Sequence, residues 1–309
     1  MSATLTPVFL FSLPRSGSTL LQRVIASHPK VDTVAEPWTL LPLLSVFDED
    51  ISRSKYGHSL LVEAVDDLCH HLDNGVDDYY LAVRAFAQSI YAAASNKESA
   101  EYFLDKTPRY HLVADKIIEA FPDARFIILW RNPLATLGSR IHSYGHVWRP
   151  YNYDVDLKEG LKSLVKASQL HKDKVHTVCY EQLMISPQKT LEALFDYIGL
   201  KFDVSSIEAF RGVDISGQMG DKTGINSYEG LSQEPLSKWK STLASPVRKW
   251  WARSYLNFLG ADDLRYMGYD IAQLHRELGD MPSEWAKAPE DLIRLIAGVI
   301  RLRVNGRRN

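Results

Sequence analysis

Short, continuous apolar runs alternate with helical patterns along most of this chain, and this alternation constrains the fold more than any other feature. Three runs have the uninterrupted apolar character of strands buried on both faces of a parallel sheet: Pro7–Leu13, Arg125–Trp130 and Lys174–Tyr180. Tyr102–Leu104 and Val31–Val34 are weaker strand candidates. The sequence therefore predicts an α/β fold with a parallel β-sheet of about five strands, flanked by helices and connected by right-handed crossovers.

Helical patterns lie between and after these runs. They cover Thr19–Ser27, Ser59–Leu72, Asp77–Ala94, Tyr110–Phe121, Leu134–Tyr144, Leu157–His171 and Pro187–Ile198. Arg211–Pro235 is rich in Gly, Ser, Asp and Asn and is predicted to be a long loop. Leu236–Trp251, Leu264–Tyr269 and Glu290–Val304 follow it and predict a mostly helical C-terminal extension.

The length and composition favour one large domain. The chain has 309 residues, of which 45% are hydrophobic, and can bury a single large core. We expect this domain at residues 1–280 and an amphipathic, basic helical tail at residues 281–309. The formal net charge of -2 argues against a nucleic-acid partner, because surfaces that bind nucleic acid carry a basic excess.

Cysteine usage and the N-terminal segment favour a cytoplasmic protein. Cys69 and Cys179 lie in segments predicted to be different elements, so they indicate neither a disulfide framework nor a zinc site. The apolar run Val8–Leu13 is too short for a signal peptide or a membrane span. His70 and His71 are adjacent on a predicted helix and point in different directions, which argues against a metal site.

A polar turn joins the first predicted strand to the first predicted helix. It reads Pro-Arg-Ser-Gly-Ser-Thr and contains Arg15, Ser16, Gly17, Ser18 and Thr19. Backbone N–H groups at a helix N-terminus bind anions, and an arginine can fork across phosphate oxygens. The Gly-Lys pair of a triphosphate-binding loop is missing. The turn therefore predicts a site for a single phosphate-like group; the alternative is an ordinary turn in which Ser or Thr caps the helix.

Other polar clusters follow the remaining predicted strands. Asp105–Tyr110 follows the strand candidate at Tyr102, and Arg131 comes directly after Trp130, with Ser139 on the next helix. Tyr180 and Glu181 end the last strand. Because the carboxyl ends of parallel strands meet at one edge of a sheet, these clusters are expected to form one binding site.

This set of clusters, in this order, resembles the PAPS-dependent sulfotransferases, which use 3'-phosphoadenosine 5'-phosphosulfate (PAPS) as donor. The resemblance runs from about Val8 to about Tyr269 and includes the Arg15 turn, Phe126–Pro133 with Ser139, Val178–Leu183 and Leu236–Trp239. Glu36 after the first helix and the run Asp105–Tyr110 are more similar to tyrosylprotein and bacterial carbohydrate sulfotransferases than to the cytosolic enzymes that act on small phenols.

The resemblance implies which residues bind the nucleotide. The turn Arg15, Ser16, Gly17, Ser18 and Thr19 is similar to the family's 5'-phosphosulfate loop. Arg131 and Ser139 correspond to its 3'-phosphate motif, and Tyr180 to a tyrosine near the adenine. Thr223 or Ser227, together with Lys238, resembles a lid over the nucleotide. Arg109 is expected to add phosphate contacts.

The resemblance also implies catalytic roles. Lys106 is similar to the lysine that stabilises the leaving oxygen, assisted by Arg15, and Glu36 lies where related enzymes carry a catalytic base. Partial burial beside apolar neighbours would raise the pKa of such a glutamate toward the range that suits a general base. The alternatives are that Glu36 caps a helix starting near Thr39, or that His142 or His146 is the base. No metal is required, because the transferred group carries one negative charge.

The function expected from this resemblance is transfer of a sulfuryl group from PAPS to an acceptor hydroxyl, in line and with Glu36 as base. A carbohydrate or glycolipid acceptor is favoured. Two alternatives stay open: a nucleotide kinase or other P-loop-type NTPase, and a catalytically inactive nucleotide-binding partner protein.

The tail at residues 281–309 combines apolar residues with arginines. A basic amphipathic helix of this kind is typical of peripheral contact with an anionic membrane, here the inner face. The favoured interpretation, however, is a helix that packs on the domain or on a second subunit in a homodimer.

Overall fold

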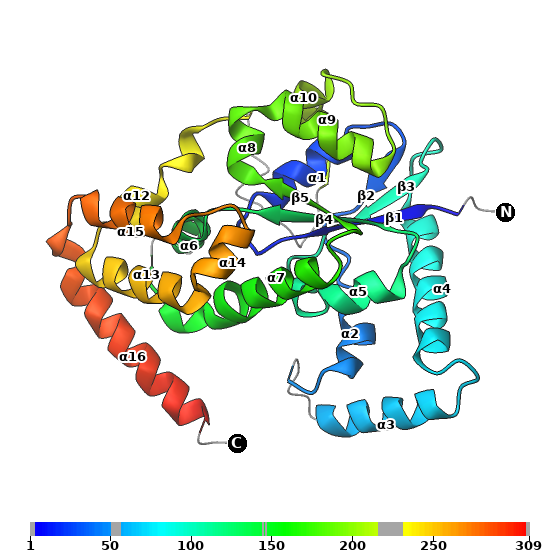
Figure 1. The fold of residues 1–309 in the computed structure, drawn as a ribbon, viewed down its shortest axis with the longest axis horizontal. Helices are drawn as coiled ribbons and strands as arrows, with labels where there is room; N and C mark the ends of the chain where they lie inside the picture. The colour runs from blue at the N-terminus through cyan, green and yellow to red at the C-terminus, as the bar shows by residue number, and fades with distance from the viewer. Residues whose placement is uncertain (1–3, 51–56, 144, 146, 216–230, 307–309) are drawn as a thin grey trace.

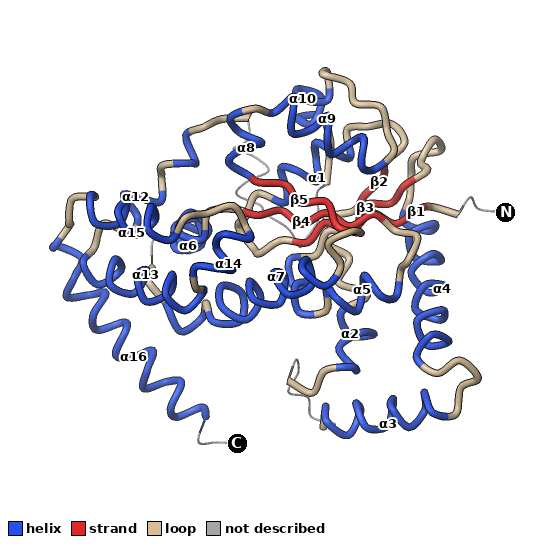
Figure 2. The backbone as a smooth tube through the Cα atoms, in the orientation of Figure 1, coloured by secondary structure: helices blue, strands red, loops and turns tan. Residues whose placement is uncertain are grey.

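The predicted parallel sheet is present and has five strands. A computed structural model describes residues 4–50, 57–143, 145, 147–215 and 231–306 (Figure 1). Its strands are β1 (Thr6–Phe11), β2 (Val31–Thr33), β3 (Tyr102–Asp105), β4 (Arg125–Trp130) and β5 (Val175–Cys179), all parallel in the order β2-β3-β1-β4-β5. Figure 2 shows them as one twisted sheet in the middle of the molecule. The α/β fold class is therefore confirmed, including both weaker strand candidates.

Strand β1 is the central strand and marks the point where the strand order reverses. From β1 the chain passes to the edge strand β2 and returns through β3, which lies beside β1; it then crosses to the other side of β1 and adds β4 and β5. Within the sheet, Val8 pairs with Leu104 on one side and with Arg125 on the other. In sheets of this kind ligands bind beyond the carboxyl end of the strand at the reversal, which here is the turn at Arg15.

Alternate side chains of β1 enter two separate cores because successive side chains of a strand point to opposite faces. Phe9 and Phe11 stack with Phe126 on one face, and helices α4 (Val76–Ala94), α5 (Ala114–Ala120) and α7 (Leu161–Leu170) cover this side. Val8 and Leu10 lie on the other face, under α1 (Ser18–Ala26), α8 (Tyr180–Ile185) and α9 (Pro187–Ile198). Figure 1 shows the resulting three layers, helix, sheet and helix.

The remaining elements surround this sandwich. They are α2 (Leu41–Leu44), η1 (Ser45–Phe47), α3 (His58–His70), η2 (Pro108–Leu112), α6 (Pro133–Ser143), η3 (Pro150–Asn152), η4 (Asp154–Gly160), α10 (Ser206–Ala209), η5 (Phe210–Gly212), η6 (Glu234–Leu236), α12 (Trp239–Thr242), α13 (Pro246–Leu259), α14 (Ala261–Tyr266), α15 (Ile271–Asp280), η7 (Trp285–Lys287) and α16 (Ala288–Gly306). None of the described helices is long and apolar enough to cross a membrane.

Several helices differ from their predicted extents. The segment predicted as Tyr110–Phe121 is split into η2 and α5, and the segment Leu236–Trp251 is split into α12 and α13. Pro246 stands at the start of α13, where its missing N–H costs nothing and its fixed φ suits a helix. Helix α15 was not predicted, although Asp270 caps it by accepting a hydrogen bond from the N–H of Ala272.

The tail helix α16 packs against α13 through a buried ion pair. The guanidinium of Arg248 contacts both carboxylate oxygens of Asp291, at 2.8 and 2.9 Å, and both side chains are buried. Figure 1 shows α16 running away from the sheet toward the C-terminus. The ion pair therefore fixes the first turns of the tail helix on the domain.

Candidate active site

The turn after β1 presents the N-terminus of α1 at the carboxyl edge of the sheet. Its backbone is unusual, because Arg15 has a φ of 72° and Gly17 a φ of 91°. Gly17, and not a serine or threonine, is the N-cap of α1, so no side chain caps the first turn. The side chains of Ser16, Ser18 and Thr19 are buried around it. This turn has the geometry of an anion-binding helix N-terminus.

Tyr180 and Arg131 pack behind this turn. A Cβ atom on Gly17 would lie 2.4 Å from Cε2 of Tyr180, so only glycine fits between the ring and the loop. The guanidinium of Arg131 lies over the Tyr180 ring, 4.2 Å from its centroid, and donates a hydrogen bond of 2.8 Å to the carbonyl of Arg15. Tyr180 is buried by these contacts. Arg131 thus connects the turn to the end of β4.

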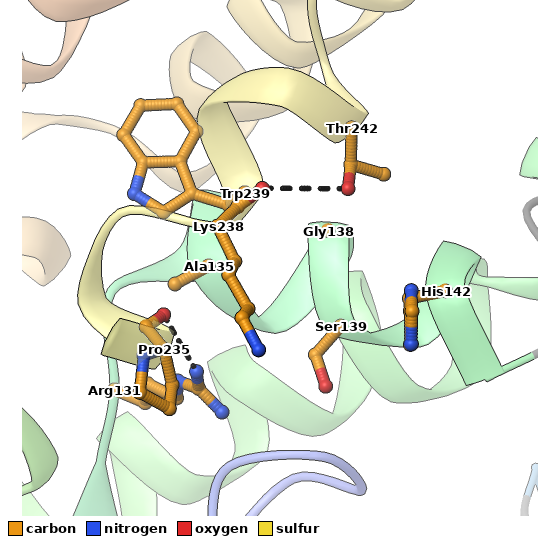
Figure 3. Close-up of a pocket in the computed structure, with 9 residues that line it drawn as sticks. All are labelled: Arg131, Ala135, Gly138, Ser139, His142, Pro235, Lys238, Trp239 and Thr242. Atoms are coloured by element: carbon orange, nitrogen blue, oxygen red, sulfur yellow. Dashed lines mark hydrogen bonds between the residues drawn. The ribbon is translucent and has the colours of Figure 1, made fainter. Parts of the chain in front are cut away.

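A small cavity beside Arg131 is lined by cationic, polar and apolar groups (Figure 3). Its volume is about 90 Å³, and its lining includes Ser139, His142 and Lys238. Among the described residues, Nε of Arg131 has no hydrogen-bond partner. The ammonium of Lys238 lies 2.8 Å from Glu234, but both side chains are exposed, so this ion pair is weak. The arrangement suits a second anionic group, separate from the turn at Arg15.

Close packing between α6 and α12 forms the wall of this cavity. A Cβ atom on Gly138 of α6 would lie 2.7 Å from the Cβ and 2.9 Å from the Cα of Trp239. Figure 3 shows Lys238, next to Trp239, extending toward the side of α6 that carries Ser139. The small residue at position 138 therefore lets the lysine and the serine face the same space.

The predicted acid–base residues form a buried ion pair. The ammonium of Lys106 lies 2.7 Å from Oε1 of Glu36, and the two side chains are 1% and 8% exposed. The indole of Trp38 donates to Oε2 of Glu36 at 3.1 Å. The backbone of Trp38 has a φ of 60°, an uncommon conformation for a residue other than glycine. Helix α2 starts only at Leu41, so Glu36 binds Lys106 and does not cap a helix.

A fully buried carboxylate lies directly before Lys106. Asp105 accepts hydrogen bonds from the hydroxyls of Tyr91 at 2.6 Å, Tyr110 at 3.1 Å and Thr107 at 3.4 Å. Burial raises the pKa of Asp105 to about 6, although the three hydroxyls and the charge of Lys106 act in the opposite direction. These groups therefore offset part of the cost of burying the carboxylate.

A second buried charge cluster lies between η2, η4 and α6, and sequence reasoning missed it. Asp156 contacts Nε of Arg109 at 3.0 Å, Nε2 of His111 at 3.2 Å and the guanidinium of Arg140 at 2.7 Å. Burial opposes ionisation of Asp156, but His111, Arg140 and Arg109 outweigh it and hold the pKa of Asp156 below its ordinary value. Burial lowers the pKa of His111. Arg109 thus pairs with Asp156; its predicted phosphate contact stays a prediction.

Glu181 was part of a predicted motif but had no assigned role. It accepts hydrogen bonds from the backbone N–H of Asn132 at 3.0 Å and from the hydroxyl of Tyr269 at 2.7 Å. These bonds connect the strand ends at β4 and β5 to the C-terminal helices. The sequence did contain a signal for this role. Glu181 comes just after β5, and the carboxyl end of β5 lies beside that of β4 in the sheet.

Most predicted site residues lie at the carboxyl edge of the sheet. The turn from Arg15 to Thr19 follows β1, Lys106 follows β3, and Arg131 follows β4 and contacts the turn. His142 lies in the cavity with Ser139. Thr223, Ser227 and His146 lie outside the described residues. Among the residues that the structure describes, no group of three or more His, Cys, Asp or Glu side chains is arranged to hold a metal ion.

Two solved sulfotransferase domains have similar folds. The sulfotransferase domain from the curacin biosynthetic pathway superposes with a TM-score of 0.54 at 21% identity, covering 87% of this chain and 99% of that domain. The sulfotransferase domain of the Synechococcus PCC 7002 olefin synthase gives 0.52 at 22% identity, covering 77% and 89%. These similarities concern the fold.

Sequence comparison gives the family. Nodulation protein NoeE of Sinorhizobium fredii is 27% identical over 89% of this chain and 70% of its own length. Protein-tyrosine sulfotransferase 2 of Gallus gallus is 21% identical over 75% of this chain, and that alignment spans 62% of the Gallus protein, less than two thirds. The model of the sulfotransferase family matches residues 7–204, more than half of the chain. This chain is therefore a member of the sulfotransferase family.

Proposed function

We propose that this protein transfers a sulfuryl group from PAPS to an acceptor hydroxyl. One observation carries the proposal: Arg131 lines a small cationic cavity and also donates a hydrogen bond to the turn at Arg15. Two anion sites are thereby connected through one side chain. A ligand with phosphates at two separate positions, such as a 3',5'-bisphosphorylated adenosine, fits this arrangement better than a linear triphosphate.

The two sites divide the nucleotide between them. The turn Arg15, Ser16, Gly17, Ser18 and Thr19 would hold the 5'-phosphosulfate, through N–H groups at the start of α1 and the arginine. Arg131, Ser139 and Lys238 would hold the 3'-phosphate, and Nε of Arg131, which has no partner among the described residues, supports this role. Tyr180 would support the turn and lie near the adenine. Thr223 is part of the same proposal but lies outside the described residues.

The Glu36–Lys106 pair provides the groups that the reaction needs. Sulfuryl transfer breaks the S–O bond to the phosphate, forms an S–O bond to the acceptor oxygen and releases the proton of the acceptor hydroxyl. Glu36 would take this proton on a remaining lone pair of its carboxylate, which Lys106 holds at Oε1 and the indole of Trp38 holds at Oε2. Lys106, assisted by Arg15, would stabilise the negative charge on the departing phosphate oxygen.

Calorimetry on the whole chain tests the nucleotide site. We expect micromolar binding of adenosine 3',5'-bisphosphate, loss of this binding in Arg131→Ala, and normal binding in Arg265→Ala, whose exposed side chain pairs with Asp262 on the surface. Preferential binding of ATP with Mg²⁺ would overturn the proposal. Transfer of labelled sulfate from PAPS tests the base: Glu36→Gln should bind the bisphosphate normally but turn over about 10²–10⁴-fold more slowly.

We also propose that the acceptor is a carbohydrate or glycolipid and that α16 contacts the membrane at its inner face. The outward side of α16 is apolar: Leu292, Ile293, Ile296, Val299 and Ile300 are each between 46% and 68% exposed. Residues 291–309 contain five arginines and a single acidic residue, Asp291, which Arg248 neutralises. An apolar face within a basic segment is complementary to an anionic bilayer.

Vesicle sedimentation and an acceptor panel test this second part. The protein should sediment with vesicles that contain phosphatidylglycerol and less with pure phosphatidylcholine. Ile293→Glu with Ile296→Glu should abolish sedimentation, whereas Leu170→Glu, an equally exposed position on α7, should not. A change of oligomeric state in the α16 variant without a change in sedimentation would indicate a homodimer instead. Sulfate transfer to a tyrosine peptide but to no sugar or glycolipid would overturn the acceptor class.

A further inference from the structure

Two hydroxyl groups connect the buried carboxylate of Asp105 to the segment that follows Glu36. The hydroxyl of Tyr110 donates its hydrogen to Asp105 and accepts the backbone N–H of Leu40 at 3.2 Å. The hydroxyl of Thr107 donates to Asp105 and accepts the backbone N–H of Trp38 at 3.1 Å. Each hydroxyl has a single hydrogen. Because this hydrogen is donated to the Asp105 carboxylate, the lone pairs of the hydroxyl oxygen are left to accept the backbone N–H groups.

The segment that these bonds hold is under backbone strain. The positive φ of Trp38 is unfavourable for a residue other than glycine and persists only where surrounding contacts enforce it. Its enforcing contacts are the N–H bond to Thr107 on one side and the indole bond to Glu36 on the other. Trp38 thus links Thr107 to the Glu36 carboxylate, which in turn binds Lys106.

Tyr91 gives an internal comparison. Its hydroxyl donates to the same oxygen of Asp105 as that of Tyr110, and its ring stacks on Phe103 with centroids 4.4 Å apart. Tyr91 comes from α4, and the described structure shows no bond from its hydroxyl to the Glu36 segment. Tyr91 thus contributes to the burial of Asp105, whereas Tyr110 and Thr107 also connect Asp105 to the backbone of the segment after Glu36.

We propose that Asp105 is a positioning residue that fixes the Glu36–Leu40 segment, through Thr107 and Tyr110, so that Glu36 and Lys106 face each other. Its effect on turnover rests on the proposed sulfuryl transfer. Its effect on the geometry of Trp38 does not depend on that function. Asp105 itself is fully buried, so it would act through the two hydroxyls and not by direct contact with a ligand.

The test measures Trp38 directly. In protein labelled with ¹⁵N-tryptophan, the indole N–H resonance of Trp38, assigned with Trp38→Phe, reports its hydrogen bond to Glu36. Thr107→Val, Tyr110→Phe and Asp105→Asn should shift this resonance and lower kcat about 100-fold, the cost of a displacement of about 1 Å. Affinity for adenosine 3',5'-bisphosphate should change less than about threefold, because the phosphate sites are elsewhere.

Two matched variants separate positioning from general loss of stability. Thr107→Ser keeps the hydroxyl and should retain the wild-type resonance and kcat, and Tyr91→Phe should lower stability without shifting the resonance. The proposal is overturned if Thr107→Val, Tyr110→Phe and Asp105→Asn leave the Trp38 resonance in place, or if Tyr91→Phe shifts it equally. If no acceptor is sulfated at all, the proposed function fails, but the resonance still decides the positioning role.

Discussion

Lys106 and Glu36 are 70 residues apart in the sequence, but their charged groups lie 2.7 Å apart in the folded protein, and both side chains are almost completely buried. Removing one partner of a buried pair leaves an uncompensated charge, whereas removing both does not. We expect Lys106→Met to lower the free energy of unfolding by about 3–5 kcal/mol and Lys106→Met with Glu36→Gln to recover most of it.

Urea denaturation of the single and double variants measures this difference. The surface pair of Lys30 and Glu101 has the same 2.7 Å separation but is about half exposed, so Lys30→Met should cost less than about 1 kcal/mol. Equal losses for Lys30→Met and Lys106→Met would show that burial does not determine the energy of the pair.

Gly17 should not tolerate a side chain. Alanine there would be strained by the φ of 91° and would place its Cβ 2.4 Å from the Tyr180 ring. Gly17→Ala should therefore lose about 1–3 kcal/mol of stability and bind adenosine 3',5'-bisphosphate poorly. Gly212→Ala is the control, because no heavy atom lies within 4 Å of its added Cβ. Thermal unfolding and calorimetry check the two variants, and unchanged binding by Gly17→Ala would contradict the role of the turn.

Gly138→Ala should affect the 3'-phosphate specifically. Replacing glycine by alanine in a helix usually stabilises it by up to about 1 kcal/mol, but here the Cβ would collide with the backbone of Trp239 and displace Lys238. We expect affinity for adenosine 3',5'-bisphosphate to fall about tenfold, while affinity for adenosine 5'-monophosphate stays the same. In Gly279→Ala, on helix α15, the new Cβ meets only the end of Arg253 at 3.8 Å, so this variant should be stabilised. Equal loss of both nucleotides would show that α12 acts only in folding.

The pH dependence of stability should reveal Asp105. Its pKa of about 6 lies above the ordinary value of 3.8, so the folded state binds its proton more tightly than the unfolded state does. This contribution is complete below the ordinary pKa and is lost as pH rises through about 6. Relative to Asp105→Asn, the wild type should therefore gain roughly 3 kcal/mol as the pH falls from about 7 to below 4.

Urea unfolding of the wild type and of Asp105→Asn across this pH range gives the difference in free energy of unfolding, in which the contributions of other titrating groups cancel.

The stability contribution of Asp32 should depend on pH with the opposite sign. Burial opposes its ionisation, but hydrogen bonds from Ser95 and the N–H groups of Thr33, Asn96 and Lys97 outweigh it and lower the pKa of Asp32. Wild type compared with Asp32→Asn should therefore lose stability as the pH falls. A flat difference for Asp105→Asn would mean that the carboxylate is not buried as described.

The sequence alone was sufficient for the fold class and for most of the carboxyl-edge clusters. Uninterrupted apolar runs such as Arg125–Trp130 indicate strands buried on both faces, and the polar residues directly after them meet because parallel strands end at one edge. Helix ends were predicted less well. The break before Pro246 and the cap at Asp270 are local signals, whereas no such signal marks the split between η2 and α5 at Val113, whose backbone is not helical.

Only the tertiary structure decided which charged groups share a site. The sequence contains no signal that pairs Asp156 with Arg109, His111 and Arg140, or that directs two hydroxyls from Asp105 to the segment after Glu36. These contacts join segments that are distant in the chain, and their strength depends on exclusion of water, which is a property of the folded core. Local patterns determine which elements form; burial determines which of their polar groups must pair.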